Sequence, residues 1–123
     1  MKLNDLYSRT KAVMFEKSTS TTYDGNIIEA ANLIIAETFT ENNMCRIFYG
    51  KKPLTDIPLM TSLESDVPYE EELLREVLPY GIAALLLIDD DLSKHALYAN
   101  KYDNARVLHQ KIVDEGDYDA LNS

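Results

Sequence analysis

The chain of 123 residues has one cysteine, four glycines, four prolines and no tryptophan, and these shortages exclude several classes of protein. A single cysteine, Cys45, cannot form a disulfide within the chain, so we expect a reducing compartment. Four glycines leave little material for phosphate-binding loops, and no P-loop, dinucleotide-binding motif or nucleophile elbow occurs in the sequence. The sequence therefore predicts a protein that is not an enzyme and binds no cofactor.

Basic residues are also scarce, because 12 Lys and Arg face 21 Asp and Glu, giving a net charge of -9. Affinity for phosphate depends on clusters of Lys and Arg, so this balance argues against a nucleic-acid-binding protein. The negative net charge remains compatible with a protein that DNA slides past, because an acidic surface repels phosphate.

Long apolar runs are missing as well. The run Ile82 to Ile88 is far shorter than the roughly 20 residues that span a bilayer. The first residues, MKLNDLYSRTK, lack the apolar region of a signal peptide. We therefore expect a soluble protein that does not associate with a membrane. It should be intracellular, or a component that is assembled inside a cell.

The length fits one domain over residues 1–123, and the apolar pattern predicts a mainly α fold, a small bundle of about four helices. Apolar residues recur at helical spacing in four stretches, which are residues 3–14, 27–39, 66–88 and 92–112. The second helix is expected to end at Asn42 and Asn43, because Asn is a common helix terminator. Gly116 is a natural end for the fourth helix, and residues 117–123 form a short acidic tail that we expect to be flexible.

Residues 46–60, between the second and third helices, carry a different pattern. Arg46 to Tyr49 is β-prone, Gly50 to Pro53 is typical of a turn, and Leu54 to Met60 could form a returning strand with Pro58 at an edge. The sequence predicts a β-hairpin or an extended arm here.

The third helix is predicted to begin near Asp66 as a cap, with Pro68 in the first turn. Pro79 removes a backbone donor, so we expect a kink near Val77 to Tyr80. Gly81 either weakens the helix or allows another part of the backbone to approach it closely. The apolar run after Gly81 should be buried on nearly all sides.

Residues with metal-binding or catalytic potential fit structural roles better. Asp89, Asp90 and Asp91 lack the spacing of a calcium loop and are typical of a helix-to-helix corner with a cap. His95 and His109 are about 21 Å apart along one predicted helix, so they cannot share a metal ion. Cys45 has no signature of a catalytic thiol.

The fourth helix is predicted to pack through one apolar face. That face comprises Ala96, Ala99, Tyr102, Ala105, Leu108 and Ile112. Eight tyrosines are present, and tyrosine suits both a core and an interface, so either use remains open.

The segment from Val67 to Tyr102, together with the order of elements before it, resembles the small head–tail connector, or adaptor, proteins of tailed bacteriophages. The matching residues are Leu78, Pro79, Tyr80, Gly81, Ile82, Ala83, Ala84, Leu85, Leu86, Asp89, Asp90, Asp91, Ala96, Tyr98, Asn100 and Tyr102. This resemblance implies a structural protein that forms a ring of about twelve copies under the portal, around the DNA channel. It implies no catalytic residue.

The resemblance also implies a set of partners. These are the portal protein, neighbouring copies of the chain and a stopper or tail-completion protein, at the head–tail interface of a virion that is assembled in the host cytoplasm. DNA would pass nearby without specific binding. We expect contacts with a neighbour or the portal from Arg46, Phe48, Tyr49, Lys51, Lys52, Leu54, Tyr118 and Leu121.

Five acidic residues are candidates for the channel lining, where they would keep DNA from adhering. They are Glu64, Asp66, Glu70, Glu71 and Glu72.

A second interpretation of the sequence is a small acidic cytosolic protein with an interaction or regulatory function, which captures a basic partner. Such a protein could be antitoxin-like, or a phage protein directed against the host. An enzyme is a third and weaker interpretation.

Overall fold

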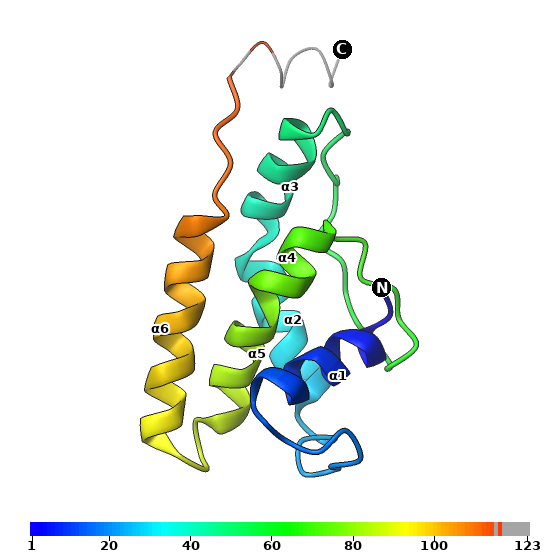
Figure 1. The fold of residues 1–123 in the computed structure, drawn as a ribbon. Helices are drawn as coiled ribbons and strands as arrows, with labels where there is room; N and C mark the ends of the chain where they lie inside the picture. The colour runs from blue at the N-terminus through cyan, green and yellow to red at the C-terminus, as the bar shows by residue number, and fades with distance from the viewer. Residues whose placement is uncertain (115, 117–123) are drawn as a thin grey trace.

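A computed structural model describes residues 1–114 and 116, and the described chain is mainly helical, as predicted (Figure 1). The helices are α1 (Leu3–Val13), α2 (Ile27–Glu37), α3 (Phe39–Phe48), α4 (Glu71–Glu76), α5 (Leu78–Leu87) and α6 (Leu92–Leu108). Two of the four predicted helices are thus divided. The second bends at Thr38 into α2 and α3, and the third breaks at Val77 into α4 and α5.

Helix α5 forms the centre of the core. It contacts α1, α2, α4 and α6, and eight of its residues are buried. The apolar run after Gly81 is largely buried, as the sequence predicts, although Ile88 at its end is 45% exposed. A helix without charged side chains is stable only when neighbours cover most of its surface, and these four helices do so.

The predicted kink lies between α4 and α5, where Val77 leaves the helical conformation with φ -121° and ψ -60°. Pro79 follows in the first turn of α5 and has no amide to donate to the carbonyl of Arg75, four residues earlier. The Nε of Arg9, on α1, donates to that carbonyl at 3.4 Å. The first helix therefore satisfies a group that the proline leaves without a helical donor.

Gly81 allows α6 to approach α5 closely. A Cβ atom on Gly81 would lie 2.8 Å from Cε1 of Tyr102 and 3.0 Å from Cδ1 of Ile34. The approaching group is thus a buried aromatic ring. The Tyr102 hydroxyl donates to Oε1 of Glu37 on α2 at 2.7 Å, and burial followed by this bond raises its pKa.

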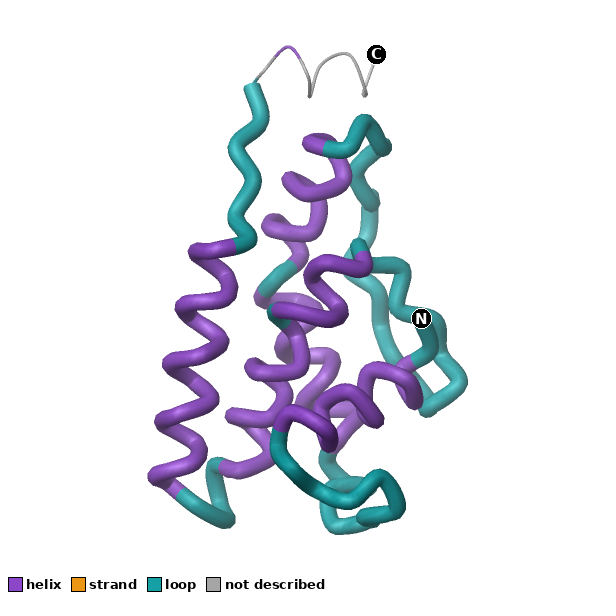
Figure 2. The backbone as a smooth tube through the Cα atoms, viewed as in Figure 1, coloured by secondary structure: helices purple, strands orange, loops and turns teal. Residues whose placement is uncertain are grey.

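The predicted β-hairpin is wrong. Arg46 to Phe48 complete α3, and residues 51–70, which we call the strap, run back without a strand partner in the described chain (Figure 2). Asparagine side chains, and not a second strand, hold the two ends of residues 54–60. Asn43 binds both the amide and the carbonyl of Leu54, at 2.8 and 3.1 Å, and Asn32 does the same for Met60, at 2.7 and 3.0 Å.

Asn42 and Asn43 therefore do not end a helix as predicted. The amide of Glu70 donates to Oδ1 of Asn42 at 2.8 Å, at the far end of the strap. Helix α3 continues past both residues because Cys45 and Ile47 still point into the protein, where they are buried. Tertiary packing and these amide bonds outweigh the terminating tendency of Asn.

Asp66 is not the cap of a helix, and α4 begins only at Glu71. Residues 63–67 pair with the start of the chain instead. Lys2 and Asp66 form an isolated antiparallel bridge, and the amides of Leu3 and Asn4 donate to the carbonyls of Ser65 and Leu63, each at 2.9 Å. The first donors of α1, which have no partner within the helix, are satisfied by this segment.

Two helices end in the same way with different residues. After α3, Lys51 N–H donates to Arg46 and Gly50 N–H to Ile47, with Gly50 at φ 79°. After α1, the amides of Phe15 and Glu16 make the equivalent bonds, with Phe15 at φ 60° and 93% exposed. Both are Schellman motifs, whose left-handed position favours glycine.

Replacing Gly81 by alanine is expected to lower the free energy of unfolding by about 1–3 kcal/mol, because the new methyl group overlaps the ring of Tyr102. Denaturant unfolding followed by circular dichroism measures the change. The matched control is Gly25→Ala, since nothing lies within 4 Å of a Cβ there. Equal effects of the two substitutions would contradict the close approach.

Replacing Phe15 by glycine is expected to raise the free energy of unfolding by about 0.5–1 kcal/mol. The left-handed backbone is costly for a residue with a side chain, and relief of that cost exceeds the extra entropy that glycine has when unfolded. The reciprocal change, Gly50→Ala, should destabilise by a similar amount in the same denaturant assay. A loss of stability in Phe15→Gly would show that the exposed ring supports the fold.

Candidate interaction surface

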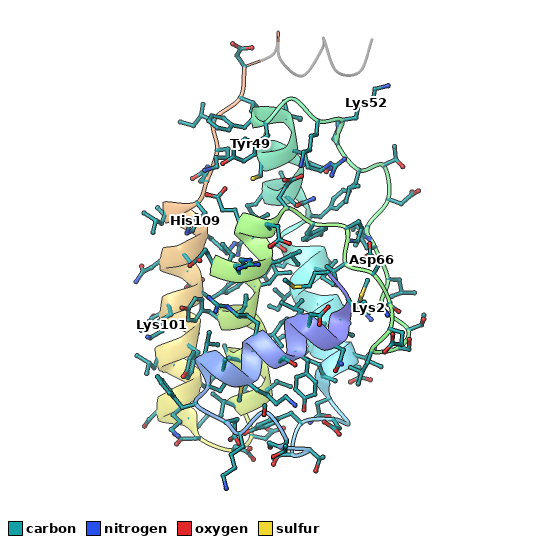
Figure 3. The ribbon with its side chains drawn as sticks, turned by 45° about the vertical axis from the view of Figure 1, so that its right-hand side comes forward. Lys2, Tyr49, Lys52, Asp66, Lys101 and His109 are labelled. Carbon is teal, nitrogen blue, oxygen red and sulfur yellow. The ribbon has the colours of Figure 1, made fainter. Side chains whose placement is uncertain are left out.

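Six of the predicted contact residues lie at the end of α3 and in the first residues of the strap. Figure 3 labels two of them, Tyr49 and Lys52. Arg46 and Lys51 both bind the carboxylate of Glu70, at 3.5 and 3.0 Å. The Nε of Arg46 also donates to the carbonyl of Lys52 at 2.7 Å. Arg46 and Lys51 therefore hold the strap to α3 and the start of α4, while the Lys52 side chain is exposed.

Phe48 and Tyr49 form an aromatic pair on this surface. Each is 53% exposed, and their rings meet edge to face with centroids 5.2 Å apart. The ammonium group of Lys111 lies 5.4 Å from the centre of the Phe48 ring and 5.9 Å from that of Tyr49. Leu54 is half-buried. The two remaining predicted contacts, Tyr118 and Leu121, lie outside the described residues.

Glu72 joins three separate parts of the chain. Its carboxylate accepts from Nδ1 of His109 and Nζ of Lys111, each at 2.9 Å, and from Sγ of Cys45 at 3.5 Å. Burial acts to raise the pKa of Glu72, but the bonds from His109, Lys111 and Cys45 outweigh it and lower that pKa. Burial and the same carboxylate raise the pKa of the Cys45 thiol to about 11.

The predicted channel-lining residues fall into two groups. The side chains of Glu64 and Asp66 are each 71% exposed and that of Glu71 is 65% exposed, whereas Glu70 and Glu72 are 12% and 23% exposed. The exposed three pair with Lys2, the N-terminal amine and Arg75, and such surface pairs are weak. Of these five residues, only Glu64, Asp66 and Glu71 therefore present accessible negative charge.

The three aspartates form a helix corner, as predicted. Asp91 caps α6 by accepting from the amide of Lys94 at 3.0 Å, and Asp90 accepts from the Tyr23 hydroxyl at 2.8 Å. Nδ1 of His95 lies 2.7 Å from the carbonyl of Ala84, so it donates there. In residues 1–114 and 116, no group of His, Cys, Asp or Glu side chains has the arrangement of a metal site.

The predicted packed face of α6 is correct for Ala99, Tyr102 and Ala105, which contact the core, and wrong for Ala96, Leu108 and Ile112, which are exposed. Tyr98 and Tyr102 are buried against the bundle, but Leu108 is 79% exposed and Ile112, just beyond the helix, is 89% exposed. Leu108 lies six positions after Tyr102, about 240° around the helix, whereas His109 at seven positions returns to the packed face. The polar contact of His109 with Glu72 thus takes the place that the sequence assigned to Leu108.

A set of apolar side chains is exposed without any signal in the sequence. The most exposed are Phe15, Leu59, Leu92, Val107, Leu108 and Ile112, all at least 72% accessible. Leu59 lies in the strap, where no helical period separates inward from outward positions. The exposure of Phe15 follows from the left-handed backbone after α1, and no motif in the sequence signals it.

Comparison of the chain with protein-family models, with curated proteins and with solved structures gave no match. Among the described residues, no helix combines the length and apolarity needed to cross a bilayer.

Replacing Glu72 by glutamine is expected to lower the free energy of unfolding at pH 7 by about 1–2 kcal/mol, because charge-assisted bonds to His109 and Lys111 are lost. The folded-state pKa of Glu72 is depressed, so its stabilisation is present above the unfolded pKa of about 4.3 and disappears as pH falls through the folded value. Denaturant unfolding at pH 7 and pH 3 measures both effects.

The control for this substitution is Glu71→Gln, one position away on the same helix. Its exposed pair with Arg75 should contribute less than about 1 kcal/mol at pH 7. A difference between the wild-type chain and Glu72→Gln that persists unchanged at pH 3 would contradict the charged role of Glu72.

Proposed function

We propose that the chain is a head–tail connector subunit of a tailed bacteriophage, a structural protein that forms a ring under the portal and lines the DNA channel. The observation that carries the proposal is the number of large apolar side chains on the surface. Thirteen are exposed among the described residues, on α2, α3, α6, the strap and the loops. Where exposed apolar side chains adjoin, as the rings of Phe48 and Tyr49 do, they are typical of a surface that another protein covers.

The residues that carry the resemblance have structural roles that support the proposal. Pro79 and Gly81 shape the break before α5 and its close approach to α6. Asp91 begins α6, and Tyr98 and Tyr102 are buried against the bundle. The resembling residues thus form the hairpin of α5, the centre of the core, and α6, which suits a rigid subunit whose surfaces bind neighbours.

The charge of the chain agrees with a place beside passing DNA. Glu64, Asp66 and Glu71 present accessible carboxylates, and the net charge is -9. Such a surface repels phosphate, so DNA would move past it without specific binding. In this proposal the partners are the portal, neighbouring copies and a stopper or tail-completion protein. The location is the head–tail interface of the virion.

The proposal includes no catalytic step and no cofactor. The most enzyme-like set of side chains, Cys45, Glu72 and His109, is occupied by its own contacts. A thiol whose pKa is raised to about 11 is almost entirely protonated near neutral pH, which makes it a poor nucleophile.

A groove favours one alternative, an acidic regulatory protein that captures a basic partner. Leu33 and Leu85 line a cavity of about 340 Å³ between α2 and the end of α5, and Glu29, Asp89 and Asp90 also border it. An apolar side chain flanked by Lys or Arg would suit this site.

The proposed function is tested by co-assembly with the portal protein encoded near the gene of this chain. We expect the full chain to bind portal-bearing capsids and to add a ring of density beneath the portal in electron micrographs. Capsids without the portal are the control. The proposal fails if the chain does not bind capsids that accept the other head-completion proteins. Tight binding to a basic protein encoded beside it would favour the regulatory alternative.

A further inference from the structure

We infer that the groove between α2 and the end of α5 binds a short basic amphipathic helix of another protein. This binding goes beyond the proposed function and does not depend on it, because a virion protein and a regulated partner can both carry such a helix. The groove has a volume of about 340 Å³, close to the lower limit of roughly 300 Å³ for ligand sites. It therefore suits a few side chains and not a broad surface.

Apolar side chains from both helices line the groove. Ala30 and Leu86 are 6% and 5% exposed, whereas Leu33 and Ile88 are 63% and 45% exposed. Leu85 is half-buried. An apolar side chain placed here would remove the exposed surface of Leu33 and Ile88 from water, which stabilises a complex.

One wall of the groove is a stripe along α2 and the residue before it. Asn26, Glu29, Ala30 and Leu33 line this wall, and spacings of three and four residues place them on one side of the helix. The stripe is about 10 Å long, which is about two helical turns. A helix that presents apolar side chains three or four positions apart matches a groove of this length.

The ionic side chains that line the groove are all acidic. They are Glu29, Asp89 and Asp90, and no Lys or Arg lines it in the described chain. The sequence accounts for this imbalance. No Lys or Arg occurs in residues 18–45 or in residues 76–93, and these two segments supply every residue of the groove.

Two of these carboxylates are free to bind a partner. Asp90 accepts from the Tyr23 hydroxyl at 2.8 Å, but Glu29 and Asp89 form no hydrogen bond or ion pair with residues 1–114 and 116. The acidic residues of the strap differ, because Glu64 pairs with Lys2 and Asp66 with the N-terminal amine. A cation that enters the groove therefore displaces no existing ion pair.

The charge and the apolar lining together define the occupant. Nucleic acid is excluded because the carboxylates repel phosphate, and an acidic segment is repelled in the same way. A basic amphipathic helix places Lys or Arg beside Glu29 and Asp89 while its apolar side chains cover Leu33 and Ile88.

The experiment titrates the full chain with a synthetic peptide of about 14 residues, in which leucines at helical spacing form one face and lysines the other. Fluorescence anisotropy of the labelled peptide gives the Kd. We expect Leu33→Ser and Glu29→Lys each to raise the Kd about tenfold or more. The first removes apolar contact, and the second places a cation against the lysines. Both positions are exposed on α2, and circular dichroism checks that the variants fold.

Matched control variants change the same residue types outside the groove. Leu59→Ser alters a leucine of the strap that is 72% exposed, and Glu64→Lys reverses a carboxylate that is 71% exposed. Each should change the Kd less than about twofold. Equal weakening by Glu29→Lys and Glu64→Lys would show only a general attraction of lysine to an acidic chain and would overturn the inference. So would equal binding of a peptide with glutamate in place of lysine.

Methyl NMR spectra locate the bound peptide. The methyl signals of Leu33, Leu85 and Ile88 should shift on titration, and those of Leu59 and Leu97, which lie outside the groove, should not. The opposite pattern, or no binding up to about 1 mM peptide, would contradict the assignment. Self-association of the chain that is lost in Leu33→Ser would show that a second copy occupies the groove, which also overturns the inference.

Binding to portal-bearing capsids is recorded separately, so the two proposals can fail independently. A chain that binds the peptide in this groove but does not bind the capsids would retain this inference and lose the connector function. A chain that binds the capsids but not the peptide would retain the connector function and lose the assignment of the groove.

Discussion

The apolar character of α5 is the constraint on which the rest of the structure depends. No charged residue occurs from Leu78 to Leu87, so water must be kept from nearly the whole circumference of the helix. Covering it takes four other helices. Gly81 lets α6 approach α5 closely, because the ring of Tyr102 on α6 lies where a side chain on residue 81 would be. The faces of these helices that do not contact α5 bear the charged and apolar side chains of the protein surface.

The features that the sequence predicts correctly are those encoded by neighbouring residues. The helical stripes, the break before Pro79 and the cap at Asp91 each depend on positions within a few residues of one another. The strap is different, because the side-chain amides that hold it come from Asn43, 11 residues before Leu54, and from Asn32, 28 residues before Met60. An asparagine that binds a distant backbone has the same local signature as one that ends a helix, so the sequence predicts a helix end at Asn42 and Asn43. With the helix ended there, the β-prone residues Arg46 to Tyr49 before a turn favour a hairpin.

The candidate interaction surface likewise combines features that neighbouring residues encode with features that depend on distant residues. The sequence identifies Arg46, Lys51 and Glu70 as charged residues near the chain's turns, but their mutual pairing exists only because the strap returns to the end of α3. Burial of Glu70 and Glu72 likewise could not be predicted, since their partners lie up to 39 residues away. Exposure of Leu108 could have been predicted more closely, by measuring its angle from Tyr102 around the helix.

The pairing of the first residues with the middle of the chain sets an order on synthesis. Helix α1 needs the carbonyls of Leu63 and Ser65 for its first amides, and Val67 donates in return to Met1 at 2.8 Å. A ribosome makes α1 first, yet these partners emerge only after half of the chain has been translated. The first helix therefore has an unfinished end while α2 and α3 are made. Its docking is a late, long-range step, the kind that slows folding.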